Sequence, residues 1–298
     1  MLMLFAGGHR MGSTYQYLIG RNALKQLGVR FEPTDNSALS TFHLQKIRKA
    51  LKVADEDPQT YFLAKAHAAF PEQAKAVLTA KNSRIFLVWR DQKDALVSDF
   101  HYAQRKARHV YSDFNDYFAR RGRKILTRNC LQHLVWQTVD DERVRAWDYL
   151  DLVYEFETSA QQMMDFAGLQ NVDLKALKES VSIKKLRQTQ NDPEGKFFRE
   201  GGKQDLLLLK PSSQILEQID YIVNEQDAAV LASSFERQDF LRTLFIGRES
   251  RDAGLRKTLH WWLHNTRQVH FLRLSVLPHF YKLSPRRLDR LMRLNRFD

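Results

Sequence analysis

Residues 2–14 read Leu-Met-Leu-Phe-Ala-Gly-Gly-His-Arg-Met-Gly-Ser-Thr, and this segment is the clearest indication of the fold class. The apolar run Leu2–Ala6 is typical of a buried strand, and two glycines end it. Apolar residues then recur at helical spacing from Ser13 to Leu27, and Gly28 predicts the end of that helix. A strand, a glycine-rich loop and a helix in this order predict an α/β fold.

The rest of the chain continues this alternation of strands and helices. Further strands are expected at Val29–Glu32, Tyr61–Ala64, Arg84–Arg90 and Arg143–Tyr149. Helices are expected at 40–51, 71–80, 93–107, 113–121, 124–139, 155–167, 173–186 and 213–233. The pattern predicts a parallel sheet with helices on both faces. In such sheets a ligand binds beyond the carboxyl ends of the strands.

Composition places the chain among globular proteins. It has 298 residues, 43% of them hydrophobic, which excludes a disordered chain, a collagen and a disulfide scaffold. Cys130 is the only cysteine, so no disulfide forms within the chain and a reducing compartment suits it. Because no run of about 18 uncharged apolar residues occurs, we expect a soluble, cytoplasmic protein without a membrane span.

The formal net charge of +12 is concentrated near the C-terminus. Residues 236–298 hold 14 Lys and Arg against 6 Asp and Glu, interleaved with aromatic residues. We therefore predict an α/β domain over 1–235 and a basic helical extension over 236–298 that packs on it. Peripheral contact of this extension with an anionic membrane or an acidic acceptor is the alternative. Nucleic acid is not an expected partner, because no nucleic-acid-binding motif is present.

The loop at 7–14 has the features of a phosphate-binding loop. It follows a strand and opens a helix, so its backbone N–H groups and the helix N-terminus point at the same place. Its spacing matches a Walker A loop, except that Ser13 occupies the position of the lysine and Arg10 supplies a cation inside the loop. The missing lysine argues against a nucleoside triphosphatase and indicates a different anion. An ordinary glycine-rich turn is the alternative.

A second group of polar residues follows the strand at 84–90. Arg90 lies at the carboxyl end of that strand, where it can meet a second phosphate, and Ser98 lies about two turns into the next helix. The two side chains converge only if the intervening loop bends back. Taken alone, the pattern is also explained by an ion-paired arginine and an ordinary helical serine.

Together these segments resemble the sulfotransferases that use 3′-phosphoadenosine 5′-phosphosulfate (PAPS). The loop His9-Arg10-Met11-Gly12-Ser13-Thr14 resembles their 5′-phosphosulfate loop. Arg90 to Ser98 matches every fixed position of their Arg-Asp-x-x-Asp-Ala-x-x-Ser motif. Weaker motifs appear as Lys65-Ala66-His67, Tyr149-Leu150-Asp151-Leu152 and Phe198-Arg199-Glu200-Gly201. Arg10 and Glu200 stand where many members of the family have lysine.

The resemblance implies a P-loop-like three-layer sandwich and a role for each matched residue. It implies that the 5′-phosphosulfate is bound by Arg10, Met11, Gly12, Ser13 and Thr14. It implies that the 3′-phosphate is bound by Arg90 and Ser98 together with Arg199, Glu200 and Gly201 of the late loop, with Tyr149 against the nucleotide. His67 is the implied general base, since a neutral imidazole with its usual pKa of about 6.5 can take a proton. Lys65 and Arg10 would stabilise charge on the transferred group and the leaving oxygen, and no metal is required.

The predicted activity is the transfer of a sulfuryl group from PAPS to a hydroxyl or amine acceptor, leaving 3′-phosphoadenosine 5′-phosphate (PAP). The acceptor is expected to be a small molecule, a lipid or a carbohydrate, because variable loops line such pockets and do not identify it further. A P-loop nucleotide or small-molecule kinase is the alternative in the same fold class. A non-catalytic anion- or membrane-binding protein is the alternative from another class.

Overall fold

A computed structural model gives the fold of the chain. It describes residues 1–32, 56–57, 59–66, 82–106, 111–189 and 205–232. The chain divides into two units, Met1–Glu236 and Arg237–Asp298, and every described residue belongs to the first. The helices expected at 40–51 and 71–80, and the basic extension at 236–298, lie outside the described residues. The domain boundary near residue 235 therefore stays a prediction.

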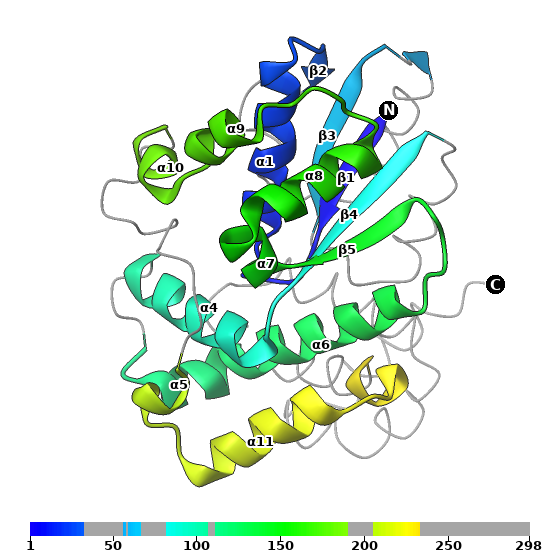
Figure 1. Ribbon diagram of the computed structural model, residues 1–298. Helices are drawn as coiled ribbons and strands as arrows, with labels where there is room; N and C mark the ends of the chain where they lie inside the picture. Colours follow the sequence, from blue (N-terminus) through cyan, green and yellow to red (C-terminus); the bar gives the residue numbers. More distant parts are fainter. Residues whose placement is uncertain (33–55, 58, 67–81, 107–110, 190–204, 233–298) are drawn as a thin grey trace, which may run out of the picture. The chain divides into compact units, whose positions relative to one another are not determined.

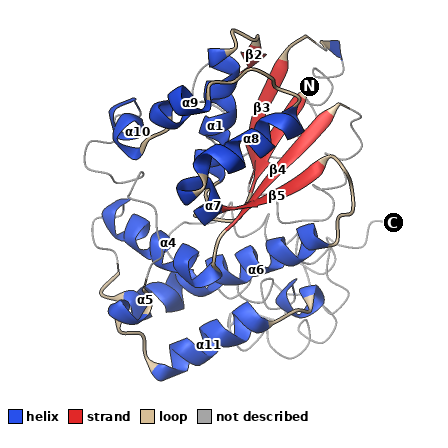
Figure 2. Cartoon of the chain, in the orientation of Figure 1, coloured by secondary structure: helices blue, strands red, loops and turns tan. Residues whose placement is uncertain are grey.

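Within the described residues, five parallel strands form one sheet in the order β2-β3-β1-β4-β5 (Figure 2). The strands are β1 (Leu2–Ala6), β2 (Phe31–Glu32), β3 (Tyr61–Ala66), β4 (Ser83–Trp89) and β5 (Val144–Asp148). All five residues of β1 are buried, as expected for a central strand with cover on both faces. The register pairs Ala6 with Ala66 on one side and with Leu87 on the other, so β1 and β3 end level at one edge of the sheet.

Helices connect the strands and cover the sheet (Figure 1). They are α1 (Ser13–Gln26), α4 (Gln92–Lys106), α5 (Phe114–Tyr117), the π-helical turn η2 (Phe118–Gly122), α6 (Arg123–Gln137), α7 (Tyr149–Tyr154), α8 (Phe156–Ala167), α9 (Leu174–Ser180), α10 (Ile183–Thr189), the 3-10 turn η3 (Leu207–Leu209) and α11 (Ser213–Asn224). The single helix expected at 173–186 is in fact two, because Ser182 caps α10 by accepting a hydrogen bond from the amide of Lys185. The last strand ends one residue earlier than expected, because the carboxylate of Asp148 caps α7.

Alternate residues of β1 contribute to two separate cores. Met3 and Phe5 belong to a cluster with apolar residues of α1 and α8. Leu2 and Leu4 belong to a second cluster, which includes Trp136 of α6. Side chains alternate across a strand with a period of two, so a wholly apolar strand needs helices on both sides. The predicted parallel sheet with helices on both faces is confirmed.

The carboxyl edge of the sheet gathers the described residues that the sequence singled out. Arg10 follows β1, Lys65 is the penultimate residue of β3, Arg90 follows β4 and Tyr149 follows β5. Strand β3 runs two residues further than its apolar pattern predicted, so Lys65 lies inside the strand. This is the edge at which open α/β sheets bind their ligands.

Candidate active site

Glycine shapes the loop between β1 and α1. Gly12 has a φ of 109°, in the left-handed region, and a Cβ atom there would overlap the ring of Tyr149. The carbonyl of Gly12 accepts the first hydrogen bond of α1, from the amide of Gln16 at 3.0 Å. The loop therefore turns directly into the N-terminus of α1, as the resemblance to a phosphate-binding loop predicted.

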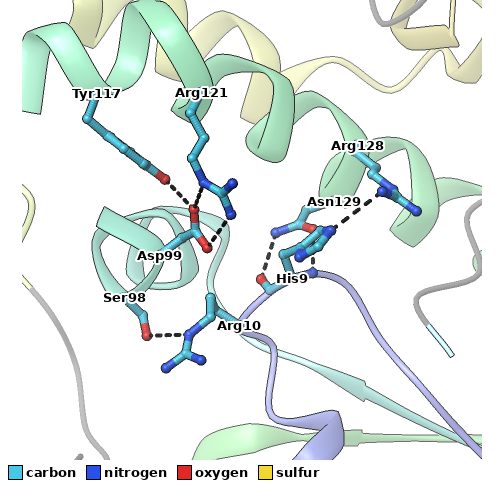
Figure 3. Close-up of polar contacts among 8 residues, drawn as sticks. All are labelled: His9, Arg10, Ser98, Asp99, Tyr117, Arg121, Arg128 and Asn129. Carbon is cyan, nitrogen blue, oxygen red and sulfur yellow. Dashed lines mark hydrogen bonds and ion pairs between the residues drawn. The ribbon is translucent and has the colours of Figure 1, made fainter. Parts of the chain in front are cut away.

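Arg10 lies in this loop in an uncommon conformation. Its φ of 64° lies in the left-handed region, which residues other than glycine seldom adopt. Its Nε donates to the hydroxyl of Ser98 on α4 at 3.4 Å (Figure 3), and its guanidinium carbon lies 4.7 Å from the ring centroid of Tyr102. Burial lowers the pKa of Arg10, while the charge of Asp99 opposes this shift. Ser98 thus contacts the loop after β1, a contact that the spacing between Arg90 and Ser98 did not predict.

Lys65 brings a second cation to the loop from β3. Its side chain is buried, and Nζ donates to the hydroxyl of Thr14 at 3.0 Å. Burial lowers the pKa of Lys65 to about 8, and the positive charge of Arg10 adds to this effect. A bound anion would favour the charged ammonium and oppose both causes.

Two further residues of the loop, Met11 and Ser13, are buried in the interior. Met11 is fully buried, and its amide donates to the carbonyl of Gly8 at 3.4 Å. Ser13 is buried at the first position of α1. The side chain of Met11 therefore anchors the loop in the core and does not face a ligand.

Arg90 is a buried cation between a carboxylate and an aromatic ring. Its Nη2 lies 3.8 Å from Oδ2 of Asp94, and its guanidinium carbon lies 4.9 Å from the ring centroid of Tyr149. Burial raises the pKa of Tyr149, while the charges of Arg90 and Arg10 oppose the rise. Because Tyr149 also packs against Gly12, it joins the loops that follow β1, β4 and β5.

The acidic residues of the Arg90–Ser98 motif have structural roles. Asp91 precedes α4, and its Oδ1 accepts a hydrogen bond from the amide of Asp94 at 2.8 Å, the geometry of a helix cap. Asp94 in turn pairs with Arg90. Arg90, Asp91 and Asp94 thus fix both the start of α4 and the position of Arg90, a role that the motif alone did not assign.

Sequence reasoning also missed Asp99, which lies directly after Ser98. This carboxylate is 1% exposed and accepts hydrogen bonds from the hydroxyl of Tyr117 at 2.9 Å and from two nitrogens of Arg121 at 2.8 and 3.2 Å (Figure 3). An aspartate among the apolar positions of an amphipathic helix signals a buried carboxylate. The signal does not say which distant residues pair with it.

Four of the predicted site residues lie outside the described residues, namely His67, Arg199, Glu200 and Gly201. The others form one region, in which Arg10, Lys65 and Arg90 bring three cations from the carboxyl ends of β1, β3 and β4 to the N-terminus of α1. Two of these cations have pKa values lowered by burial, and Tyr149 packs closely against Gly12 of the loop. The arrangement fits a ligand with several negative groups, such as PAPS.

A parallel sheet with a cation-lined loop at its carboxyl edge defines a class of anion-binding α/β proteins. The family model described as "Sulfotransferase domain" matches residues 16–212, which is more than half of the chain. The chain therefore belongs to the sulfotransferase family. No curated protein matches the sequence significantly.

Several solved structures are similar to the chain. The crystal structure of mouse sulfotransferase SULT7A1 complexed with PAP has a TM-score of 0.57 and 15% identity, covering 78% of this chain and 88% of that one. Retinol dehydratase in complex with androsterone and inactive cofactor PAP has a TM-score of 0.45 and 14% identity, covering 89% and 81%. A sulfotransferase from Alicyclobacillus acidocaldarius has a TM-score of 0.43 and 11% identity, covering 72% and 98%. The likeness to the mouse enzyme confirms the fold class.

Proposed function

We propose that the site at the carboxyl edge of this sheet catalyses transfer of the sulfuryl group of PAPS. The acceptor is a hydroxyl or amine of a small molecule, a lipid or a carbohydrate. The protein is a PAPS-dependent sulfotransferase by family. PAPS supplies the SO3 group carried on its 5′-phosphate, and PAP is the product. The observation that carries the assignment of residues is the gathering of Arg10, Lys65 and Arg90 beside the N-terminus of α1.

Arg10 and the first residues of α1 are assigned to the 5′ end of the donor. During sulfuryl transfer, negative charge grows on the oxygen that bridges sulfur and phosphorus, and donors fixed in advance lower the barrier. Arg10 stays charged at any working pH, and its contact with Ser98 restrains the guanidinium. The backbone amides of Gly12, Ser13 and Thr14 add donors and the positive end of the α1 dipole.

The 3′-phosphate is assigned to Arg90 and Ser98, with Arg199 and the backbone of Gly201 contributed by the later loop, in which Glu200 replaces the lysine of the family. Arg90 suits this role because its pair with Asp94 fixes the guanidinium at the end of β4. A 3′-phosphate is also the group that separates PAPS and PAP from ATP. Tyr149 is assigned to the nucleotide, since it lies between the Gly12 loop and Arg90.

His67 is assigned as the general base on the basis of the family resemblance. It is the residue directly after β3 and follows Lys65 by two positions. A neutral histidine there would take the proton from the acceptor hydroxyl or amine as the new bond to sulfur forms. Lys65, held by Thr14, would stabilise charge on the transferred group.

Calorimetric titration with PAP tests the donor site. The comparison uses wild type, Arg10→Ala and Arg90→Ala, with Arg30→Ala as the matched control at the opposite edge of the sheet, where Arg30 forms an exposed ion pair with Asp57 at 3.9 Å. Each site variant should bind PAP about 10- to 100-fold more weakly, because a hydrogen bond to a charged group contributes about 1.5–3 kcal/mol. The control should bind PAP like wild type.

The same titrations with ATP·Mg²⁺ and adenosine 5′-monophosphate define the specificity. We expect a clear preference for the 3′-phosphorylated nucleotide, and loss of that preference in Arg90→Ala. Each variant is first checked by circular dichroism, because removal of Arg90 leaves Asp94 buried without its cation. Equal affinity of wild type for PAP and for ATP·Mg²⁺ would overturn the donor assignment.

A further inference from the structure

Asn129 of α6 forms a two-bond clamp on the loop after β1. Its Oδ1 accepts from the amide of His9 at 2.8 Å, and its Nδ2 donates to the carbonyl of His9 at 3.0 Å (Figure 3). One carboxamide thus satisfies both backbone groups of one residue, as a neighbouring strand would. Asn129 is 1% exposed, so this pairing takes place away from water.

The loop is built to admit this side chain. A Cβ atom at Gly8 would overlap Oδ1 of Asn129 and lie 2.8 Å from its Cγ, so only glycine leaves room for the carboxamide. The imidazole of His9 extends toward Arg128, the residue before Asn129 on α6, with Nε2 3.5 Å from Nη1. Two consecutive residues of α6 therefore hold the backbone and the ring of His9.

The residue that Asn129 holds, His9, directly precedes Arg10, whose backbone conformation is unfavourable. Arg10 follows His9 and has a φ of 64°. Such a conformation is costly for a residue with a side chain, and it persists where the surrounding structure determines it. Hydrogen bonds to both His9 backbone groups fix the peptide that enters Arg10. These hydrogen bonds therefore restrict the direction in which the Arg10 side chain extends from the loop.

We propose that Asn129 is a positioning residue for sulfuryl transfer. It holds the loop so that Arg10 and the backbone amides of Gly12 and Ser13 face the 5′-phosphate of the donor. Asn129 touches no nucleotide in this assignment and acts only through His9 and Arg10. The inference rests on the proposed binding of the 5′ end of the donor at this loop.

The test separates the two ends of the nucleotide. PAP and adenosine 3′-monophosphate share the adenosine and the 3′-phosphate, and only PAP carries the 5′-phosphate. Both are titrated calorimetrically into wild type, Asn129→Ala, Asn129→Asp and the control Thr127→Val. Thr127 is buried on the same helix, and its hydroxyl donates to the carbonyl of Arg123 in that helix at 2.9 Å.

We expect Asn129→Ala to bind PAP about tenfold more weakly or worse, with its affinity for adenosine 3′-monophosphate within about twofold of wild type. Asn129→Asp keeps an acceptor for the His9 amide but places a second oxygen against the His9 carbonyl, so it should lose PAP affinity as well. Thr127→Val should bind both ligands like wild type. Unchanged PAP affinity in both Asn129 variants, or an equal loss for both ligands, would overturn the positioning role.

The result for wild type distinguishes failure of the proposed donor site from failure of the proposed role of Asn129. If wild type binds PAP no better than adenosine 3′-monophosphate, the assignment of the 5′ end of the donor fails before Asn129 is tested. If neither Asn129 variant folds, hydrogen exchange of the His9 amide in wild type decides the question. A slowly exchanging amide whose resonance shifts when PAP binds supports the clamp, and rapid exchange overturns it.

Discussion

Lys65 is surrounded by groups that make its charge sensitive to pH. It is buried in β3, it donates to Thr14, and the charge of Arg10 lies nearby. Its pKa falls from 10.5 to about 8, mainly through burial. Between these two values the unfolded chain holds a proton that the folded protein has lost. The contribution of Lys65 to the free energy of unfolding therefore increases, and the folded state becomes more stable, as pH rises through this window.

Ligand binding at Lys65 should have the opposite pH dependence. A bound phosphate favours the protonated ammonium, so we predict that PAP affinity falls as the pH rises from about 7 to about 9.5, with a midpoint above 8. The phosphates of PAP stay fully ionised over this range, since their second pKa is about 6. Calorimetry at several pH values measures the fall. Lys65→Arg, which keeps its charge throughout, should show a flat profile, and a flat wild-type profile would contradict the prediction.

At the scale of elements, Asp99 joins α4 to the segment that contains α5, η2 and α6. Its carboxylate accepts from Tyr117 at the end of α5 and from Arg121 within η2 (Figure 3). The hydrogen bond and charge of Asp99 raise the pKa of Arg121, which favours the charged guanidinium. A π-helical turn is uncommon and frequently lies near a functional site, and here the buried carboxylate stabilises it.

We predict that Asp99→Asn lowers the free energy of unfolding by about 1.5–3 kcal/mol, because it removes a charged acceptor and leaves Arg121 without its ion pair. Tyr117→Phe, which removes one hydroxyl from the same carboxylate, should cost about 1 kcal/mol. Urea unfolding followed by circular dichroism gives both values. A loss below about 0.5 kcal/mol for Asp99→Asn would show that the pair does not stabilise this segment.

At the scale of the whole molecule, all described donor-site residues belong to the unit Met1–Glu236. The excess positive charge is concentrated in 236–298, outside the described residues. In the described part of the chain, no helix has both the length and the apolar character needed to cross a bilayer. Donor binding and any membrane contact should therefore be separable by shortening the chain.

We predict that a chain ending at Glu236 binds PAP within about threefold of the full chain. Vesicles with and without phosphatidylserine test the basic extension, using sedimentation of both forms at low and at physiological salt. If the extension caps the core, neither form should sediment with vesicles. Salt-sensitive sedimentation of the full chain alone would instead favour the peripheral membrane contact.

Local sequence determined much of the fold and part of the site. The apolar runs of β1 and β4 predicted buried parallel strands, because only strands with cover on both faces can be apolar throughout. The glycines and Arg10 predicted the anion loop, since that chemistry depends on neighbours in the chain. The exact ends of helices were less certain, as at Ser182, where one hydroxyl starts a new helix.

Tertiary structure alone decided which distant side chains meet. The spacing from Arg90 to Ser98 gave no sign that Ser98 contacts Arg10, which lies 88 residues earlier. Nor could any local pattern assign Asn129 to His9 across 120 residues. Such hydrogen bonds form only when α4 and α6 pack beside the loop after β1, and that packing depends on the whole core. Local sequence thus supplies the chemical groups available to this protein, and the packing of its helices fixes how those groups are held in place.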